Sequence, residues 1–327
     1  MKRHKICKII FAILAVFLCV AFYELIGICV TYKKQPAVSD ATIKETQNIM
    51  SVAGRENTER AVIIEKNSQA LLERVRLIQN AKDEIILSTF AFKSDESGKL
   101  ILGALHDAAD RGVHVRILVD GMESWIDMEG NPYFYGLSSH ENVEIKLYNK
   151  ANPLKPWKTM GRMHDKYLIA DGKIYILGGR NTYNYFLGDF PGHKNFDRDV
   201  LVVCDEPQKD NSVNQLWNYF ETIWEQEDCR YFHNSKKLAD RQSVKKAVLE
   251  LQEGYQQYFE VNKEKICDTD YADETFETEK IILLSNPIHT QAKEPVVWYQ
   301  LGELMKNAKE RVKIHTPYII CNDMMYN

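Results

Sequence analysis

Residues 9–32 form an apolar run that a single charge, Glu24, interrupts. Its 24 residues are enough to cross a bilayer core of ~30 Å as a helix. A cleaved signal peptide is the alternative, because residues 9–23 alone have the length of a signal-peptide core. Lys33 and Lys34 stand where a small-residue cleavage site is expected, so the pattern favours an uncleaved anchor.

Basic residues surround this run unevenly. Four precede it and two follow it, namely Lys2, Arg3, Lys5 and Lys8 against Lys33 and Lys34. The more basic side of a span usually faces the cytoplasm. We therefore expect a single-pass protein of the cell membrane, with a cytoplasmic N-terminus and an extracytoplasmic catalytic domain.

Extended and helical patterns alternate from about residue 60. Short apolar runs predict strands at Ala61–Ile64, Ile85–Phe92, Val113–Val119, Val143–Tyr148, Lys166–Ala170, Lys173–Leu177 and Val200–Cys204. Apolar residues at helical spacing predict helices from a Ser68 cap to Ile78, over Ile101–Ala108 with Gly112 after its end, over Val213–Trp224 and over Val244–Tyr258. Strand, helix and strand joined by short connections predict a parallel βαβ unit and therefore an α/β fold.

Two segments near the C-terminus resemble earlier ones. Residues 307–316 resemble residues 80–89, and residues 282–286 resemble residues 63–67, at nearly equal offsets. This similarity predicts that a second copy of the domain starts near residue 279. We expect a membrane anchor at 1–33, a polar linker at 34–59, a first domain at 60–232, a connecting helix and acidic loop at 233–278, and the start of a second domain at 279–327.

One motif carries the candidate chemistry. His164, Lys166, Asp171, Gly178-Gly179 and Asn181 fit the pattern H-x-K-x4-D-x6-G-G-x-N. Six fixed positions at about one in twenty each would match by chance on the order of once in 10⁵ chains of this length. The motif is therefore a specific signal.

The residue types suit phosphate chemistry. On a strand, residues i and i+2 share a face, so His164 and Lys166 are expected to point into one cleft. A neutral imidazole can attack phosphorus covalently, and the Lys166 ammonium can balance charge on the phosphate oxygens. Gly178 and Gly179 let the backbone approach a phosphate closely, and the Asn181 amide can donate to it.

Composition adds two limits. A formal net charge of −4 gives no support for a dedicated polyanion binder, so no nucleic-acid partner is expected. The seven cysteines show no disulfide framework, and no cluster of His, Cys or Asp has metal-ligand spacing beyond the motif. We therefore expect neither a metal nor another cofactor.

The motif resembles the HKD motif of the phospholipase D superfamily, in the form found in its cardiolipin synthase-like bacterial branch. Residues 162–166, 178–181 with Tyr185-Phe186, and 196–200 carry this resemblance, together with residues 95–98 and 108–113 before the motif. It implies a phospholipase D-like α/β/α sandwich with a mixed sheet. It also implies metal-free transfer through a phosphohistidine, at a site shared by two HKD halves.

The resemblance assigns roles residue by residue. His164 and Lys166 would be catalytic, while Asn181, Gly178, Gly179 and Arg162 would bind the substrate. Asp171 matches the aspartate of the motif, and its role is left open between structural and catalytic. A carboxylate that orients His164 is expected on a later strand, where Asp197 fits and Asp199 remains the alternative.

Basic residues also gather just before the motif. Lys150, Lys155, Lys158, Arg162 and Lys166 meet only one acidic residue within 150–166. This segment is either a solvated loop or a funnel for anionic head groups. Pro153, Pro156 and Trp157 in the same loop could dip into a membrane surface.

We therefore expect phosphatidyl transfer or hydrolysis on anionic membrane phospholipids. A nuclease or other phosphodiesterase of the same superfamily is one alternative, and a non-catalytic half-site fragment that binds phosphate or lipid is another. No second H-x-K-x4-D occurs in the sequence, so the partner half would come from a missing C-terminal region or from a second chain. We expect the chain to be inactive as a monomer, because the second half would protonate the leaving group.

Overall fold

The computed structural model describes residues 2–51, 58–233, 235–289, 291–314 and 316. Contacts divide the chain into two compact units. Unit 1 comprises Met1–Lys34, Gly54–Leu283 and Ile288–Ala292. Unit 2 comprises Gln35–Ala53, Leu284–Pro287 and Lys293–Asn327.

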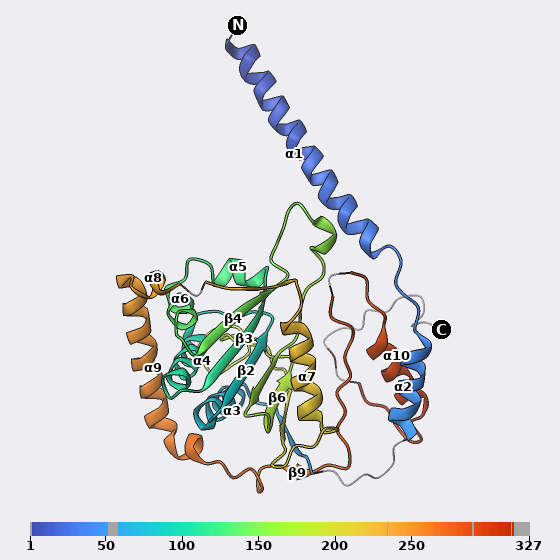
Figure 1. The fold of residues 1–327 in the computed structure, drawn as a ribbon, viewed down its shortest axis with the longest axis vertical. Helices are drawn as coiled ribbons and strands as arrows, with labels where there is room; N and C mark the ends of the chain where they lie inside the picture. Colours follow the sequence, from blue (N-terminus) through green and yellow to red (C-terminus); the bar gives the residue numbers. More distant parts are fainter. Residues whose placement is uncertain (1, 52–57, 234, 290, 315, 317–327) are drawn as a thin grey trace. The chain divides into compact units, whose positions relative to one another are not determined.

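A mixed sheet forms the centre of unit 1 (Figure 1). Its strands are β1 (Arg60–Ile64), β2 (Glu84–Thr89), β3 (His114–Asp120), β4 (Val143–Tyr148), β5 (Tyr167–Ala170), β6 (Ile174–Gly178), β7 (Asp199–Val203), β8 (Cys229–Tyr231) and β9 (Phe276–Glu277). Their order across the sheet is β8-β4-β3-β2-β5-β6-β7-β1-β9. Strands β2, β3 and β4 run parallel, and β5 pairs antiparallel with β2.

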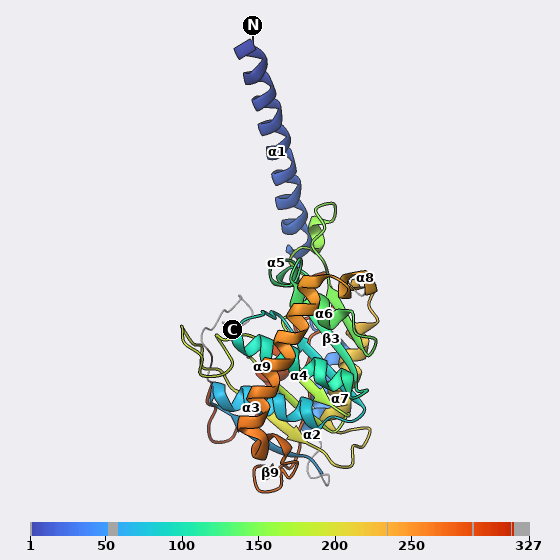
Figure 2. The same cartoon turned by 90° about the vertical axis from the view of Figure 1, so that its left-hand side faces the viewer.

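Unit 1 contains helices that cover both faces of this sheet and an exposed N-terminal helix that covers neither face. They are α1 (Lys2–Tyr32), α3 (Asn67–Asn80), α4 (Glu96–Asp110), α5 (Glu123–Asp127), α6 (Pro132–Ser138), the 3-10 helix η1 (Pro156–Lys158), α7 (Ser212–Trp224), α8 (Lys236–Ala239) and α9 (Gln242–Cys267). Figures 1 and 2 show α3, α4, α6 and α9 on one face and α7 on the other.

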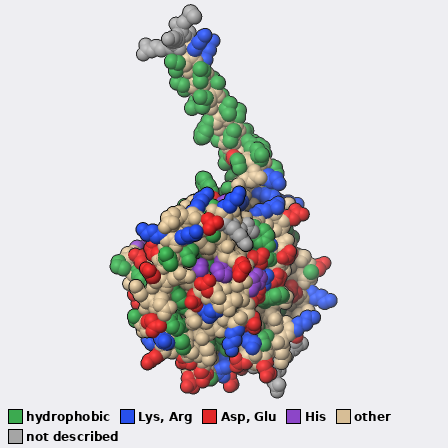
Figure 3. Space-filling model, turned by 60° about the vertical axis from the view of Figure 1, so that its left-hand side comes forward, with side chains coloured by type: hydrophobic (Ala, Val, Ile, Leu, Met, Phe, Trp, Pro, Cys, Tyr) green, Lys and Arg blue, Asp and Glu red, His purple; other side chains and the backbone are tan. Residues whose placement is uncertain are grey.

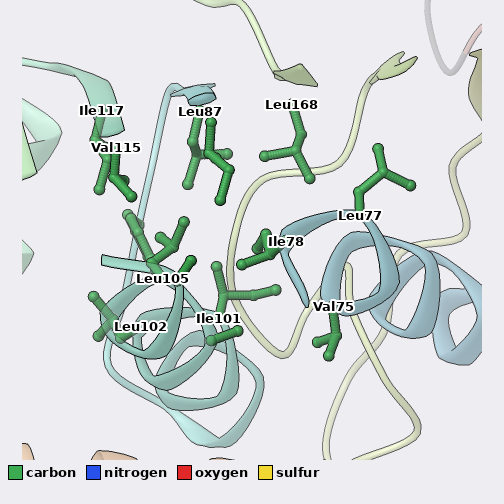
Figure 4. Packing of buried hydrophobic residues seen from close by; sticks show 14 of the residues in the cluster. Val75, Leu77, Ile78, Leu87, Ile101, Leu102, Leu105, Val115, Ile117 and Leu168 are labelled. Carbon is green, nitrogen blue, oxygen red and sulfur yellow. The ribbon is translucent and has the colours of Figure 1, made fainter. Parts of the chain in front are cut away.

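Successive side chains of a strand point to opposite faces of the sheet, and this alternation explains why the sheet has an apolar core on each face. Ile85 and Leu87 of β2 pack into the core beneath α3 and α4, whereas Ile86 packs with Phe220 of α7. Figure 4 shows side chains of α3 and α4 meeting those of β2, β3 and β5 in the first of these cores. The predicted α/β/α sandwich with a mixed sheet is confirmed.

Three expectations about local structure need correction. Helix α3 begins at Asn67, and no side chain caps it at Lys66, so Ser68 is inside the helix. Strand β5 begins at Tyr167, so His164 and Lys166 precede the strand. Helix α9, expected as a connector, packs against α3, α4 and α6 because its apolar stripe completes their layer.

Unit 2 also differs from expectation. Helix α2 (Asp40–Ser51) lies in the segment predicted to be a polar linker. Its start is held by Glu294, whose carboxylate accepts hydrogen bonds from the Ser39 amide (2.8 Å) and the Thr42 hydroxyl (2.6 Å). Helix α10 (Val296–Lys306) packs against α2.

The expected second copy of the domain is not built as strands where the structure describes it. Residues 281–288 and 308–314 form no strand, and residues 317–327 lie outside the described residues. A strand needs a neighbouring strand to pair its backbone groups, and none pairs with these two segments among the residues that the structure describes. Helix α10 precedes residues 307–314 as helix α3 precedes strand β2, and a second copy of the domain stays a prediction.

Helix α1 contains the predicted membrane span. Lys5–Thr31, 27 residues, is long and apolar enough to cross a membrane, and its side chains are exposed. Exposure of so many large apolar side chains indicates a lipid environment or another apolar partner.

Candidate active site

His164 and Lys166 of the motif lie at one edge of the sheet, just before strand β5. Strands β2, β3 and β4 are parallel, so their carboxyl ends share this edge, which we call the carboxyl edge. Strand β5 starts there, because Tyr167 pairs with Ser88 near the end of β2. Loops at the carboxyl ends of parallel strands are the usual place for sites in α/β folds.

Phe90, just after β2, joins the two central side chains. The ring of His164 lies edge-on to the Phe90 ring, with 4.7 Å between centroids. The Lys166 ammonium lies 5.3 Å from the centroid of the same ring and donates to the His164 carbonyl oxygen at 2.5 Å. The imidazole and the ammonium are therefore neighbours although neither residue is on the strand. His164 is exposed, whereas Lys166 is buried.

The environment adjusts both titratable groups. Desolvation, followed by the charge on Lys166, lowers the pKa of His164 below its ordinary value of 6.5. Burial lowers the pKa of Lys166 to about 8, against the opposing effect of Asp165 and Asp197. At neutral pH these directions give a neutral imidazole beside a largely protonated amine.

Asp120, at the end of β3, anchors the backbone that leads to His164. Its fully buried carboxylate accepts from the Arg162 guanidinium at 3.0 Å and from the Met163 amide at 3.1 Å. Burial raises the pKa of Asp120 despite the charge on Arg162. Arg162, expected to bind substrate, is thus paired with a carboxylate of the protein and also donates to the Asn149 carbonyl oxygen at 2.5 Å.

Asn149 fixes the loop between β4 and the motif. Its backbone is in the left-handed region, with φ of 48°, which asparagine tolerates better than most residues. Its amide nitrogen donates to the carbonyl oxygens of Lys158 and Gly161, each at 2.7 Å. The loop ends are therefore tied together immediately before Arg162.

Two glycines lie against carboxylates of later residues. A Cβ at Gly178 would collide with Asp199, and a Cβ at Gly179 would collide with Asp197. The close approach that these glycines permit is therefore to this chain's own carboxylates. A phosphate contact at the same place remains a prediction.

The two aspartates have different surroundings. Asp199 is fully buried between Arg74 at 2.9 Å and Arg180 at 3.3 Å. Asp197 is half-buried, accepts from the Arg198 amide at 2.8 Å and contributes to the field at Lys166. Neither carboxylate contacts the His164 imidazole in the part of the chain that the structure describes.

The remaining motif residues fall at opposite edges. Asn181 is buried near Phe90, and its carbonyl oxygen accepts from the Ala91 amide at 3.2 Å. Asp171 lies at the far end of β5, with φ of 52°. Its carboxylate accepts from the amides of Lys82 (2.9 Å), Asp83 (2.8 Å) and Glu84 (3.0 Å). Asp171 thus ties the β5–β6 turn to the start of β2, away from His164.

Sequence reasoning missed Phe90, Asp120 and Asn149. Each lies at or directly after the carboxyl end of a buried parallel strand, which is the signal that could have identified them. Within the described residues, no group of three or more His, Cys, Asp or Glu side chains could hold a metal ion.

Residues 75–224 match the family described as "Cardiolipin synthase, PLD-like domain". The chain therefore carries a domain of the phospholipase D superfamily, and this domain is cardiolipin synthase-like.

Similar proteins span more than one kind. An uncharacterized protein of Helicobacter pylori (strain ATCC 700392 / 26695) is 27% identical over 292 residues, which are 81% of this chain and 55% of that protein. Cardiolipin synthase C of Escherichia coli (strain K12) is 29% identical over 154 residues, 43% of this chain and 31% of that protein. The chain thus spans about half or less of the length of these relatives. The structure of NucT from Helicobacter pylori is 18% identical with a TM-score of 0.41, and the match covers 53% of this chain and 99% of that one.

Proposed function

We propose that this chain supplies one His–Lys half-site of an enzyme that transfers or hydrolyses the phosphatidyl group of membrane phospholipids. One observation carries the proposal: the His164 imidazole and the Lys166 ammonium lie against the same Phe90 ring at the carboxyl edge. The lowered pKa of His164 supports a neutral nucleophile. The cardiolipin synthase-like relatives and the candidate span in α1 support a lipid substrate.

The chemistry balances without a cofactor. A nitrogen of His164 forms a bond to phosphorus while the bond from phosphorus to the leaving alcohol oxygen breaks. Lys166 stabilises the charge on the non-bridging oxygens. A second HKD half, from another segment or another chain, protonates the departing oxygen. Water or an acceptor alcohol then attacks phosphorus and gives its proton to the second half, while the bond from phosphorus to the His164 nitrogen breaks. The product is that of hydrolysis or of transfer, and His164 is free again.

Neighbouring residues support this pair in different ways. Asn181 binds a phosphate oxygen through its amide nitrogen, beside the glycines at 178 and 179. Arg162 and Asp120 position the backbone of Met163 and hence His164. Asp197 helps to keep Lys166 charged, and Asp171 holds the sheet.

Turnover of a defined lipid tests the proposal. The full chain, with its second HKD half supplied, is reconstituted in phosphatidylglycerol vesicles with EDTA, and products are measured by mass spectrometry. Cardiolipin with free glycerol indicates transfer, and phosphatidic acid indicates hydrolysis. His164→Ala should abolish either product, whereas His114→Ala, at an exposed histidine on the opposite edge, should retain it.

The same variants separate the alternatives. Equal lipid turnover in wild type and His164→Ala would contradict the proposal. Cleavage of single-stranded DNA that needs His164, without any lipid turnover, would assign the site to a nuclease instead.

A further inference from the structure

Five exposed apolar side chains gather at the carboxyl edge. Trp125 and Ile126 belong to α5, and Leu154, Trp157 and Met160 belong to the loop of residues 150–161. We call these five residues the apolar rim. Leu154 is 76% exposed and Trp125 is 66% exposed. Large exposed apolar side chains that gather at one edge usually mark an interaction surface.

Strand order places both segments of the rim at the same edge of the sheet. Helix α5 follows β3, the 150–161 loop follows β4, and these strands are parallel neighbours. The Gly121 amide donates to the Tyr148 carbonyl oxygen at 2.7 Å, which joins the two exits. Figures 1 and 2 both show α5 and the loop at the same end of the sheet.

The loop holds its apolar side chains outward. Pro156 is buried, and the Asn149 amide nitrogen binds both the Lys158 and Gly161 carbonyl oxygens. Lys158 also pairs with Asp228. The exposure of Leu154 and Trp157 is therefore a property of a folded loop, and burying them needs an external apolar partner.

Helix α1 identifies that partner. The Tyr23 hydroxyl donates to the Leu154 carbonyl oxygen at 3.1 Å, and Gly27 packs against Pro156. Tyr23 lies eight residues before the end of the candidate span at Thr31, which is ~12 Å at ~1.5 Å per residue. The loop tip is thus beside a part of α1 that itself requires lipid or its interface, where tyrosine and tryptophan are enriched.

Charge agrees with a lipid surface. Lys150 and Lys155 are exposed in the loop, and Lys33 and Lys34 follow α1. Figure 3 shows Lys and Arg side chains gathered around the base of α1. Basic side chains close to the end of a membrane span are attracted to anionic lipid head groups.

We propose that the apolar rim inserts into the interface of an anionic phospholipid bilayer, the same bilayer that α1 crosses. This second contact turns the carboxyl edge toward the membrane, so that His164 opens onto the head groups and not onto bulk solvent. The orientation deepens the proposed function, but insertion needs no chemistry at His164. A binding measurement therefore tests it separately from turnover.

Tryptophan quenching in the membrane is the direct test. The full chain is reconstituted in phosphatidylglycerol vesicles whose acyl chains carry bromine at carbons 6 and 7. Brominated lipid should quench part of the fluorescence, and the double variant Trp125→Phe/Trp157→Phe should lose most of that quenchable part. Trp217→Phe is the matched control, because Trp217 binds Glu84 at the opposite edge of the sheet. It should leave the quenchable part unchanged.

Two further measurements complete the experiment: one changes the charge of the lipid or of the loop, and the other uses a quencher dissolved in water. Quenching should fall severalfold in phosphatidylcholine vesicles and in Lys150→Glu/Lys155→Glu. Quenching that is unchanged in Trp125→Phe/Trp157→Phe would overturn the proposal. So would quenching of Trp125 and Trp157 by aqueous iodide, which would show a solvated loop. Protection from both quenchers would show a protein partner on the rim and would also overturn it.

Discussion

Asp120→Asn is the perturbation that best separates two roles for Arg162. The carboxylate of Asp120 is fully buried and joins Arg162 to the Met163 amide. Breaking one side of a buried ion pair costs about 3–5 kcal/mol. Arg162 is 18% exposed and keeps its bond to Asn149, so we expect the lower end, about 3 kcal/mol, in the free energy of unfolding.

The neutral double variant Asp120→Asn/Arg162→Gln should lose less than the sum of the two single variants. Burial raises the pKa of Asp120, which means that desolvation already opposes the charged pair. A coupling of ~1–3 kcal/mol is therefore expected. Activity should fall about 10²-fold in Asp120→Asn, since Met163 and His164 lose their anchor.

Stability is measured by urea unfolding of the full chain in detergent micelles, followed by circular dichroism. Lipid turnover is measured on the folded protein with its second HKD half supplied. If Arg162 instead binds the substrate phosphate, Arg162→Gln would raise KM and leave the unfolding free energy unchanged. Additive effects of the two substitutions on stability would likewise refute the positioning role.

Three further predictions concern the same site. The pH profile of kcat/KM should be bell-shaped, rising through the pKa of His164 below 6.5 as the imidazole loses its proton and falling above about 8 as Lys166 becomes neutral; a flat profile between pH 5 and 9 would contradict these assignments. Lys166→Met should lower kcat by ~2–4 kcal/mol of transition-state stabilisation without loss of folding stability, because it removes a buried charge; stopped assays and thermal unfolding measure the two effects. Asp171→Ala should cost about 1–2 kcal/mol in unfolding free energy and leave turnover per folded molecule intact, while Asp171→Asn, which tolerates the positive φ, should cost less; a selective loss of kcat in either variant would show a catalytic role.

The sequence predicts strands β1 to β7 well because each is a run of mostly apolar residues, whereas the short and largely exposed edge strands β8 and β9 were not predicted. Val143–Tyr148 was predicted with the same bounds as β4, and the β2–α4–β3 unit is parallel as expected. Helix α2 was not predicted, because few of its residues are apolar and its start depends on Glu294, which is more than 250 residues away in the sequence. Local pattern holds no information about such a contact.

Only the local part of the site was predictable from the sequence. Spacing alone identified His164 and Lys166, since the motif is local. The pairing of Arg162 with Asp120 and the contact of Phe90 with both motif side chains depend on neighbouring strands. Charge made Arg162 look available for substrate, and only the fold showed that a buried carboxylate already holds it.

A phosphorylated histidine is the most direct test of the central claim. The complete site, with its second HKD half supplied, is incubated with phospholipid labelled in the phosphate, quenched in alkali and digested for mass spectrometry. We predict an acid-labile phosphoryl adduct on His164 that is absent in His164→Ala and present in Asp171→Asn. An adduct on another residue, or one that persists in His164→Ala, would contradict the assignment of His164 as the nucleophile.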